Sequence, residues 1–193
     1  MYPDPRGALR AALEQDPRPT APQGDRLAAV LTPIVESPIP SLVFTERAAG
    51  MSRHAGEISF PGGLLDDGEE LRAAALREAY EEIGIVPGTV ELVGALPPVH
   101  TTVSGILVVP FVGVVRDAPA FVVSDAEIAQ VLVFPVSALA DAERQVEYRL
   151  EQGRTWRGWA YDVEGLTVWG ATGWMLHSLL EILREETPWM LTK

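Results

Sequence analysis

Apolar residues recur along this chain with two different periods, which together predict a mixture of strands and helices. Short alternating or continuous apolar runs predict strands at residues 26–35, 41–48, 89–96, 105–115 and 130–136. The run at 105–115 is nearly all apolar, which is typical of a strand buried on both faces. A shorter run at 56–60 leads directly into Pro61, Gly62 and Gly63.

Helical spacing predicts helices at residues 7–15, 69–83 and 168–186. The middle segment holds neither glycine nor proline, and Gly84 follows it at the position where helices commonly end on a glycine. The segment SDAEIA, residues 124–129, predicts a short helical turn, and residues 144–162 predict a hairpin around Gly153.

These elements predict one α/β domain with a mixed central sheet, because helices occur before, within and after the strands. We expect the domain to span residues 26–186, preceded by a helix and loop at 1–25 and followed by a tail at 187–193. The chain has no internal repeat and no low-complexity linker that would divide it further.

Composition and charge narrow the function classes. The 193 residues are 47% hydrophobic and 22% charged, as in globular proteins, and their formal net charge of −12 argues against nucleic-acid or membrane-surface partners. No cysteine is present, which excludes disulfides and thiolate chemistry. Because the first fifteen residues lack an apolar signal segment and the apolar run at 103–115 is too short to span a membrane, we expect a cytoplasmic protein. The oligomeric state stays open, with a homodimer as one option.

Three glutamates crowd one turn of the predicted helix at 69–83. Glu78, Glu81 and Glu82 project to one side on a helical wheel, although like charges at this spacing repel each other by about 0.2–0.5 kcal/mol. They form either an acidic surface or a site for a hard divalent cation such as Mg²⁺, which prefers carboxylate oxygens. Arg77 suits both interpretations, and the helix alone favours the acidic surface.

The wheel also predicts what surrounds the glutamates. Ala74 and Ala75 flank the acidic face and would leave room there for a ligand. Another stripe should face the core; it consists of Leu76, Ala79, Ile83 and Tyr80.

Upstream glycines shift the balance toward a functional site. Gly62 and Gly63 could form a plain turn, but glycine also lets the backbone approach a metal or phosphate closely. Fixed spacing joins Gly63 to Glu69, to the acidic helical turn and to Gly84, and this joint pattern is very specific.

Residues 63–85, GLLDDGEELRAAALREAYEEIGI, resemble the signature of the Nudix hydrolases, G-x5-E-x7-R-E-U-x-E-E-x-G-U, where U is a bulky aliphatic residue. Every charged and glycine position matches, and only Ala79 is smaller than usual. The resemblance implies an α/β/α sandwich and hydrolysis, dependent on Mg²⁺ or Mn²⁺, of a diphosphate linked to another group.

The resemblance also implies roles for individual residues. Metal ligands would be Glu78 and Glu82, joined by Glu81 and the Gly63 carbonyl. Arg77 would orient the cluster and Glu69 would support it. The general base would be Glu81 or Glu127.

Residues 42–63, LVFTERAAGMSRHAGEISFPGG, are similar to the motif that precedes the signature in coenzyme A pyrophosphatases. The matching positions are Thr45, Arg47, Ala48, Gly56, Phe60, Pro61, Gly62 and Gly63. Ser52 stands where the motif has its second arginine, and Arg53 follows one residue late. Later segments also look like this subfamily, so the resemblance extends over about residues 26–185.

This second resemblance implies a substrate, coenzyme A or a derivative, cleaved to 3′,5′-ADP and 4′-phosphopantetheine. Arginine suits its phosphates because the guanidinium group binds them in a bidentate manner. Candidate substrate contacts are Arg47, Arg53, His54, Gly62, His100 and Thr101. Two alternatives remain: a Nudix pyrophosphatase for ADP-ribose, NADH or dinucleoside polyphosphates, and a Nudix module that binds nucleotides without catalysis.

Overall fold

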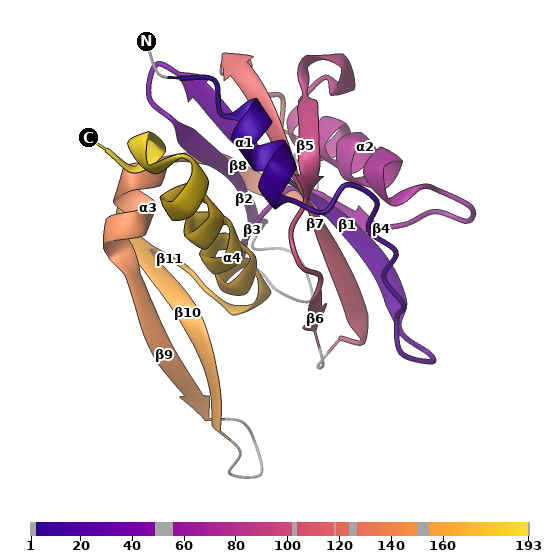
Figure 1. Ribbon diagram of the computed structural model, residues 1–193. Coiled ribbons are helices and arrows are strands. Elements are labelled where there is room, and N and C mark those ends of the chain that lie inside the picture. Colours follow the sequence, from indigo (N-terminus) through magenta and orange to yellow (C-terminus); the bar gives the residue numbers. More distant parts are fainter. Residues whose placement is uncertain are drawn as a thin grey trace.

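A central mixed sheet lies between helices in the computed structural model of the protein, which describes residues 3–48, 56–101, 104–117, 119–123, 127–149 and 155–192. Helix α2 (Leu71–Ile83) covers one face of the sheet, and α1 (Arg6–Ala12) and α4 (Gly170–Glu186) lie on the other (Figure 1). The predicted α/β fold with a mixed central sheet is confirmed. A separate apolar core fills each face, one under α2 and one under α1 and α4.

The centre of the sheet is a long parallel pair formed by β1 (Arg26–Ser37) and β7 (Ile106–Asp117). Antiparallel strands extend it on both sides: β2 (Ser41–Arg47), β3 (Ile58–Ser59), β4 (Gly62–Leu64), β5 (Glu91–Ala95), β6 (Val99–Thr101) and β8 (Ile128–Pro135). Both central strands are almost continuously buried. This agrees with the prediction that the apolar run at 105–115 is a strand buried on both faces.

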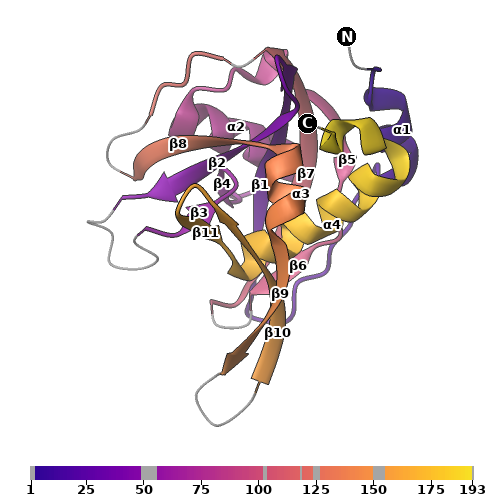
Figure 2. The ribbon, with the colours of Figure 1, turned by 90° about the vertical axis from the view of Figure 1, so that its left-hand side faces the viewer.

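A smaller three-stranded sheet carries the projecting hairpin seen in Figure 2. Its strands are β9 (Glu143–Arg149), β10 (Thr155–Val163) and β11 (Leu166–Val168). The predicted hairpin is confirmed by the antiparallel pairing of β9 with β10. The remaining elements are α3 (Val136–Ala142) and two 3₁₀ turns, Pro87–Thr89 and Pro188–Leu191.

Some predicted boundaries differ from the structure. Residues Ile128 and Ala129, predicted within a helical turn, begin strand β8, while 124–126 lie outside the described residues. Helix α3 and the short strands β4, β6 and β11 have no clear periodic signal because each is at most seven residues long. Pairing with longer neighbours stabilises such short strands.

Strands β1 and β2 diverge, and this divergence creates the position of the candidate site. They pair only at Ile34 and Val35 of β1, whereas the other half of β1 pairs with β4. The Gly62-Gly63 pair, which could have formed a plain turn, is therefore a strand within the sheet.

Both terminal segments pack on the sheet domain. Leu9 and Leu13 are buried in the core under α4, and Glu14 exchanges backbone hydrogen bonds with Ala95. Met190 is buried near the other end of the chain. Among the described residues, no helix has both the length and the apolar character needed to cross a membrane.

Candidate active site

Helix α2 ends at Gly84, as its sequence predicts, but the set of side chains that it buries differs from the predicted one. Gly84 adopts the left-handed conformation with φ of 75°, and its N–H bonds the Tyr80 carbonyl at 2.9 Å. Ala74 and Ala75 are fully buried in the core, so the prediction that they flank an open ligand face is wrong. Tyr80, predicted to face the core, is 54% exposed.

The buried side of α2 includes a glutamate. Glu82 is only 6% exposed and lies on the same side of the helix as Ala75 and Ala79, which contact the sheet. Its carboxylate accepts a hydrogen bond of 3.1 Å from the Gly62 N–H. The carboxylate is thereby fixed against the backbone of β4.

Burial raises the pKa of Glu82 from its ordinary 4.5 to about 7. The Gly62 N–H and the positive charge of Arg47 oppose this rise, whereas the negative charges of Glu78 and Glu127 add to it. A buried carboxylate among other carboxylates is an environment in which a cation would be strongly stabilised.

The pairing of β4 with β1 determines which residues of β4 direct their backbone polar groups toward β1 and which direct them away. Leu31 N–H bonds Pro61 O at 2.8 Å and Leu65 N–H bonds Leu27 O at 3.3 Å, on either side of the Gly63–Ala29 pair. Because facing residues alternate along an antiparallel ladder, Gly63 turns its backbone polar groups toward β1.

The residues on either side of Gly63 turn outward. Gly62 donates its N–H to Glu82, and Leu64 accepts a bond of 3.3 Å from Arg77. The backbone carbonyl on the side of Glu82 is therefore that of Gly62, whereas the family resemblance implies the carbonyl of Gly63 as a metal ligand.

Gly63 instead supplies space for Glu78. A Cβ atom built on Gly63 would stand 2.6 Å from both Cδ and Oε1 of Glu78, far inside contact distance. The carboxylate thus lies directly against the backbone of β4, which requires glycine at that position.

Arg77 is the centre of an ion-pair network. Its guanidinium donates two hydrogen bonds of 2.8 Å to Glu69, one of 2.9 Å to Glu78 and one of 3.0 Å to Glu81. Glu69 also accepts the Asp66 N–H at 3.0 Å. The Arg77 hydrogen bonds, followed by the Asp66 N–H, lower the pKa of Glu69 to about 2, so it remains ionised and holds the arginine in place.

Glu127 and Arg47 both lie close enough to Glu82 to shift its pKa. Two backbone bonds position the segment that leads to Glu127: Val122 N–H to Ile83 O at 3.1 Å, and Ala48 N–H to Glu127 O at 2.8 Å. Residues far apart in sequence are therefore brought together around one carboxylate. Arg53 and His54 lie outside the described residues.

His100 and Thr101 have partners within the protein. The His100 ring lies 2.6 Å from Asp25, and the Thr101 hydroxyl donates to the Ile106 carbonyl at 2.9 Å. These contacts hold the turn between β6 and β7. Their predicted role in substrate binding remains a prediction.

The oxygen-rich donor set of Glu78, Glu82 and the Gly62 backbone fits a hard divalent cation. Within the described part of the chain, no three acidic or histidine side chains already converge as a metal-binding group. Glu78 bonds Arg77 instead, so its carboxylate would have to turn toward Glu82 when a cation binds.

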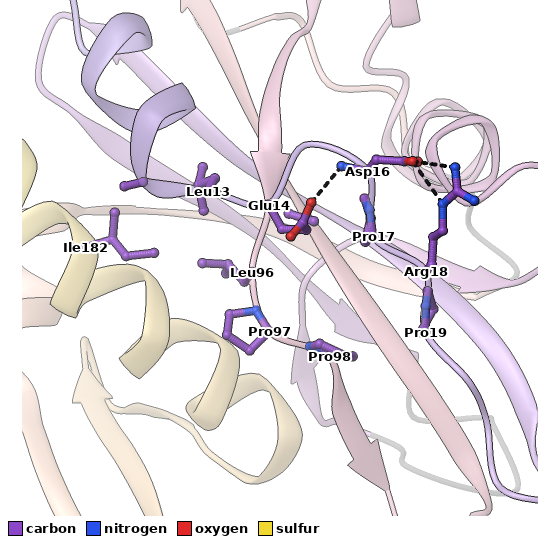
Figure 3. A pocket seen from close by; sticks show the side chains of 12 residues that line it. Leu13, Glu14, Asp16, Pro17, Arg18, Pro19, Leu96, Pro97, Pro98 and Ile182 are labelled. Carbon is purple, nitrogen blue, oxygen red and sulfur yellow. Dashed lines mark hydrogen bonds and ion pairs between the residues drawn. The ribbon is translucent and has the colours of Figure 1, made fainter.

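A hollow of about 770 Å³ lies elsewhere, between the segment after α1, the end of β5 and α4 (Figure 3). Leu13, Leu96 and Ile182 line it together with the Asp16–Arg18 ion pair. None of the α2 glutamates lines this hollow, so the candidate site rests on carboxylate geometry and not on a deep cavity.

Comparison with protein-family profiles matches residues 25–152 to the NUDIX domain. The chain belongs to the Nudix family. It is 41% identical over 162 residues to "Uncharacterized Nudix hydrolase NudL" of Cronobacter sakazakii, covering 80% of this chain and 81% of that protein. Identity to the protein of the same name from Escherichia coli (strain SMS-3-5) is 39%, with the same coverage.

Solved Nudix structures share the fold. The NUDIX domain of Shewanella oneidensis NrtR, complexed with ADP ribose, aligns with a TM-score of 0.55 at 16% identity and covers 88% of this chain and 93% of that one. The MutT protein of Methanosarcina mazei aligns with a TM-score of 0.56 at 16% identity, covering 88% and 99%. The protein is a Nudix hydrolase, and Nudix hydrolases generally use divalent metal ions.

Proposed function

We propose that this Nudix hydrolase cleaves the diphosphate bond of coenzyme A or its derivatives, with Mg²⁺ or Mn²⁺ as cofactor, to 3′,5′-ADP and 4′-phosphopantetheine. The observation that carries the proposal is the contact between α2 and β4, where Glu82 is buried against Gly62 and Glu78 lies against Gly63. An acidic surface alone would not require a buried glutamate, because water would solvate every carboxylate.

Glu78, Glu82 and the Gly62 carbonyl would hold the metal, with Glu81 beside them. When bound, a divalent cation would activate water and neutralise charge that develops on the diphosphate. Arg77 restrains Glu78 and Glu81 through one guanidinium, and Glu69 fixes that guanidinium from the opposite side. The chain's own contribution is therefore a guanidinium, fixed by Glu69, that restrains Glu78 and Glu81, and a Glu82 carboxylate fixed against β4.

The coenzyme A motif around Arg47 supports the choice of substrate. Arg47 stands near the buried end of the site, where its charge already lowers the pKa of Glu82. A guanidinium there would attract a substrate phosphate in an otherwise strongly acidic protein.

A pyrophosphatase for ADP-ribose or another dinucleotide is the main alternative, favoured by the ADP ribose complex of the structurally similar Shewanella domain. A non-catalytic module is a third candidate, but it would have no need for the complete set of glutamates.

Turnover assays with Mg²⁺ on coenzyme A, 3′-dephospho-coenzyme A, ADP-ribose, NADH and diadenosine tetraphosphate test these candidates. We expect the highest kcat/KM with coenzyme A and a lower value without its 3′-phosphate. Faster cleavage of ADP-ribose or NADH would replace coenzyme A as the substrate. No cleavage of any of the compounds, with Mg²⁺ or Mn²⁺, would contradict catalysis altogether.

For the general base we propose Glu127 ahead of Glu81. Arg77 donates a hydrogen bond of 3.0 Å to Glu81, so that carboxylate is already engaged by the guanidinium. Glu127 is exposed, yet it lies close enough to Glu82 for its negative charge to raise the pKa of Glu82.

The variant Glu127→Gln should therefore lower kcat by about 10²–10⁴-fold, whereas Glu81→Gln should cost less. Metal titration of both variants provides the control, since loss of a base should leave metal affinity nearly unchanged. If Glu81→Gln is the more damaged variant in kcat while its metal affinity holds, the base is Glu81.

A further inference from the structure

A short segment of chain, residues 119–123, lies against the C-terminal end of α2 after the chain has left β7. Val122 donates its N–H to the Ile83 carbonyl at 3.1 Å. Carbonyls in the last turn of a helix lack partners within the helix, so this bond completes the end of α2. The segment is thereby joined to the helix that carries the metal-site glutamates.

Gly84 makes this close approach possible. A Cβ atom built on Gly84 would stand 3.1 Å from both the backbone nitrogen and the Cβ of Val122, which is closer than ordinary van der Waals contact. Val122 itself is 70% exposed, so the contact depends on backbone proximity and not on burial of the valine side chain. Gly84 therefore ends α2 and also leaves room for the 119–123 segment beside it.

The residues on either side of Val122 face inward. Phe121 and Val123 are partly buried and pack against the apolar core under α2, a core that includes Ile83 and Ile128. Alternation of inward and outward side chains is the pattern of an extended chain. The segment is therefore anchored to α2 by one backbone hydrogen bond and by two apolar side chains.

Glu127, which follows this segment, is held from its other side as well. Its carbonyl accepts the Ala48 N–H at 2.8 Å, and its neighbour Ile128 is only 2% exposed in the core under α2. The chain from Val123 to Glu127 spans at most about 14 Å even when fully extended. Glu127 is thus an exposed residue between two anchors in one core.

The pairing of β8 with β2 contributes to the second anchor. Arg47 faces Ile128 and Glu46 faces Gln130, so Ala129 is an extra residue in β8, as in a β-bulge. Without it, Ala129 would face Arg47 in place of Ile128. A bulge redirects the side chains beside it, and bulges are common next to active sites. Here the extra residue directs the larger side chain of Ile128 into the core beside Glu127.

We propose that Phe121 and Val123 are positioning residues for the hydrolysis, because they hold the 119–123 segment against α2 and so keep Glu127 beside the metal-site carboxylates. They act through Glu127 and need not contact the substrate. The role of Glu127 as general base rests on the proposed function. The attachment of the segment to α2 does not.

Steady-state kinetics tests the catalytic part. Each of Phe121→Ala and Val123→Ala should lower kcat about tenfold or more, because a displaced base transfers protons poorly. KM and the affinity for Mg²⁺ should stay within about threefold of the native values, since the glutamates of α2 are unchanged. Phe121→Leu, which keeps an apolar contact with the core, should restore most of the kcat.

Val90→Ala is the matched control. Val90 is also a partly buried valine packed against the core under α2, but it precedes β5, on the opposite side of the sheet from β2 and β8. Its kcat should remain within about threefold of the native value. A loss of kcat in Val90→Ala as large as that in Val123→Ala would overturn the proposal, because general loosening of the core would then explain both.

A double-mutant cycle tests whether the two residues act through Glu127. In the Glu127→Gln background, Phe121→Ala and Val123→Ala should lower kcat by no more than about twofold further, since no base remains to be misplaced. If the loss is as large in this background as in the native one, the residues act on another group and the proposal is wrong.

Amide hydrogen exchange measures the attachment without turnover. In Phe121→Ala and Val123→Ala, the Ala48 N–H, which bonds the Glu127 carbonyl, should exchange at least about fivefold faster than in the native protein. The Leu31 N–H, which bonds the Pro61 carbonyl, should keep its native rate and so exclude global opening.

The exchange data separate this proposal from the proposed function. Native exchange at Ala48 in both alanine variants would show that the segment does not hold Glu127, whatever the enzyme hydrolyses. Faster exchange at Ala48, combined with native kcat in Glu127→Gln, would support the attachment and reject Glu127 as the base.

Discussion

Replacing Glu82 by glutamine should lower kcat/KM by at least about 10²-fold while the fold is retained. Glutamine has the same shape and can still accept the Gly62 N–H through its amide oxygen, so the contact between α2 and β4 survives. The negative charge that would hold the metal is lost. Steady-state kinetics with Mg²⁺, together with circular dichroism, measures both parts. Activity within about threefold of the native value would show that Glu82 is not an essential ligand.

The same variant has a second expected effect, on the stability of the metal-free protein. Because the folded-state pKa of Glu82, about 7, exceeds its ordinary 4.5, the native protein prefers a protonated Glu82. This contribution to stability is fully present below pH 4.5 and is lost as the pH rises through 7. Glutamine does not titrate, so Glu82→Gln should match the native stability near pH 4.5 and exceed it by about 1–3 kcal/mol at pH 8.

Chemical denaturation in EDTA at a series of pH values measures this difference. Glu36→Gln is the control. It removes the charge of a half-buried carboxylate that lies away from α2 and pairs with Arg6. A native protein more stable than Glu82→Gln at pH 8 would contradict the raised pKa.

Replacing Gly63 by alanine should reduce activity by about 10–100-fold with little loss of stability. The atoms nearest to the new methyl group would be those of the Glu78 carboxylate, which sits at the end of a flexible side chain and can move. The methyl group would keep the Glu78 carboxylate from the position against β4 from which it would turn toward Glu82, and misplacement of a catalytic group by about 1 Å can cost about 10²-fold.

Gly62→Ala provides the contrast. Its methyl group would stand 2.5 Å from both the Ala29 carbonyl oxygen and the Val30 Cα, which are backbone atoms that cannot move without disturbing β1. We expect this variant to be destabilised by about 1–3 kcal/mol or more. Gly88→Ala, where nothing lies within 4 Å, should change neither property. Equal stability of the Gly62 and Gly63 variants would show that the two glycines are not distinguished in this way.

The orientation of α2 shows why the acidic turn could not be interpreted from its own residues. A helical wheel gives the angles between side chains, and those angles predicted correctly that Ala79 and Ile83 face the core. It does not say how far the buried stripe extends to each side. Packing against the sheet extended that stripe to include Ala74 and Glu82 and left Tyr80 exposed.

Short elements were the least predictable part of the fold. Strand β4 has three residues, two of them glycine, and glycine is depleted in strands. It exists because β1 and β2 diverge and leave backbone groups of β1 without partners, and this is a property of the whole sheet. The same pairing turned Gly62, not Gly63, outward to Glu82.

The sequence by itself determined the family, the order of the main strands and helices, the glycine end of α2 and the spacing of its glutamates, because local propensity and residue spacing act over a few turns of chain. Only the tertiary structure decided that Glu82 is buried, that Glu127 and Arg47 lie near it, and that Trp156 and Trp174 meet beside β6. Each of these depends on contacts between residues far apart in sequence, and the pKa of Glu82 follows from its burial in the assembled fold.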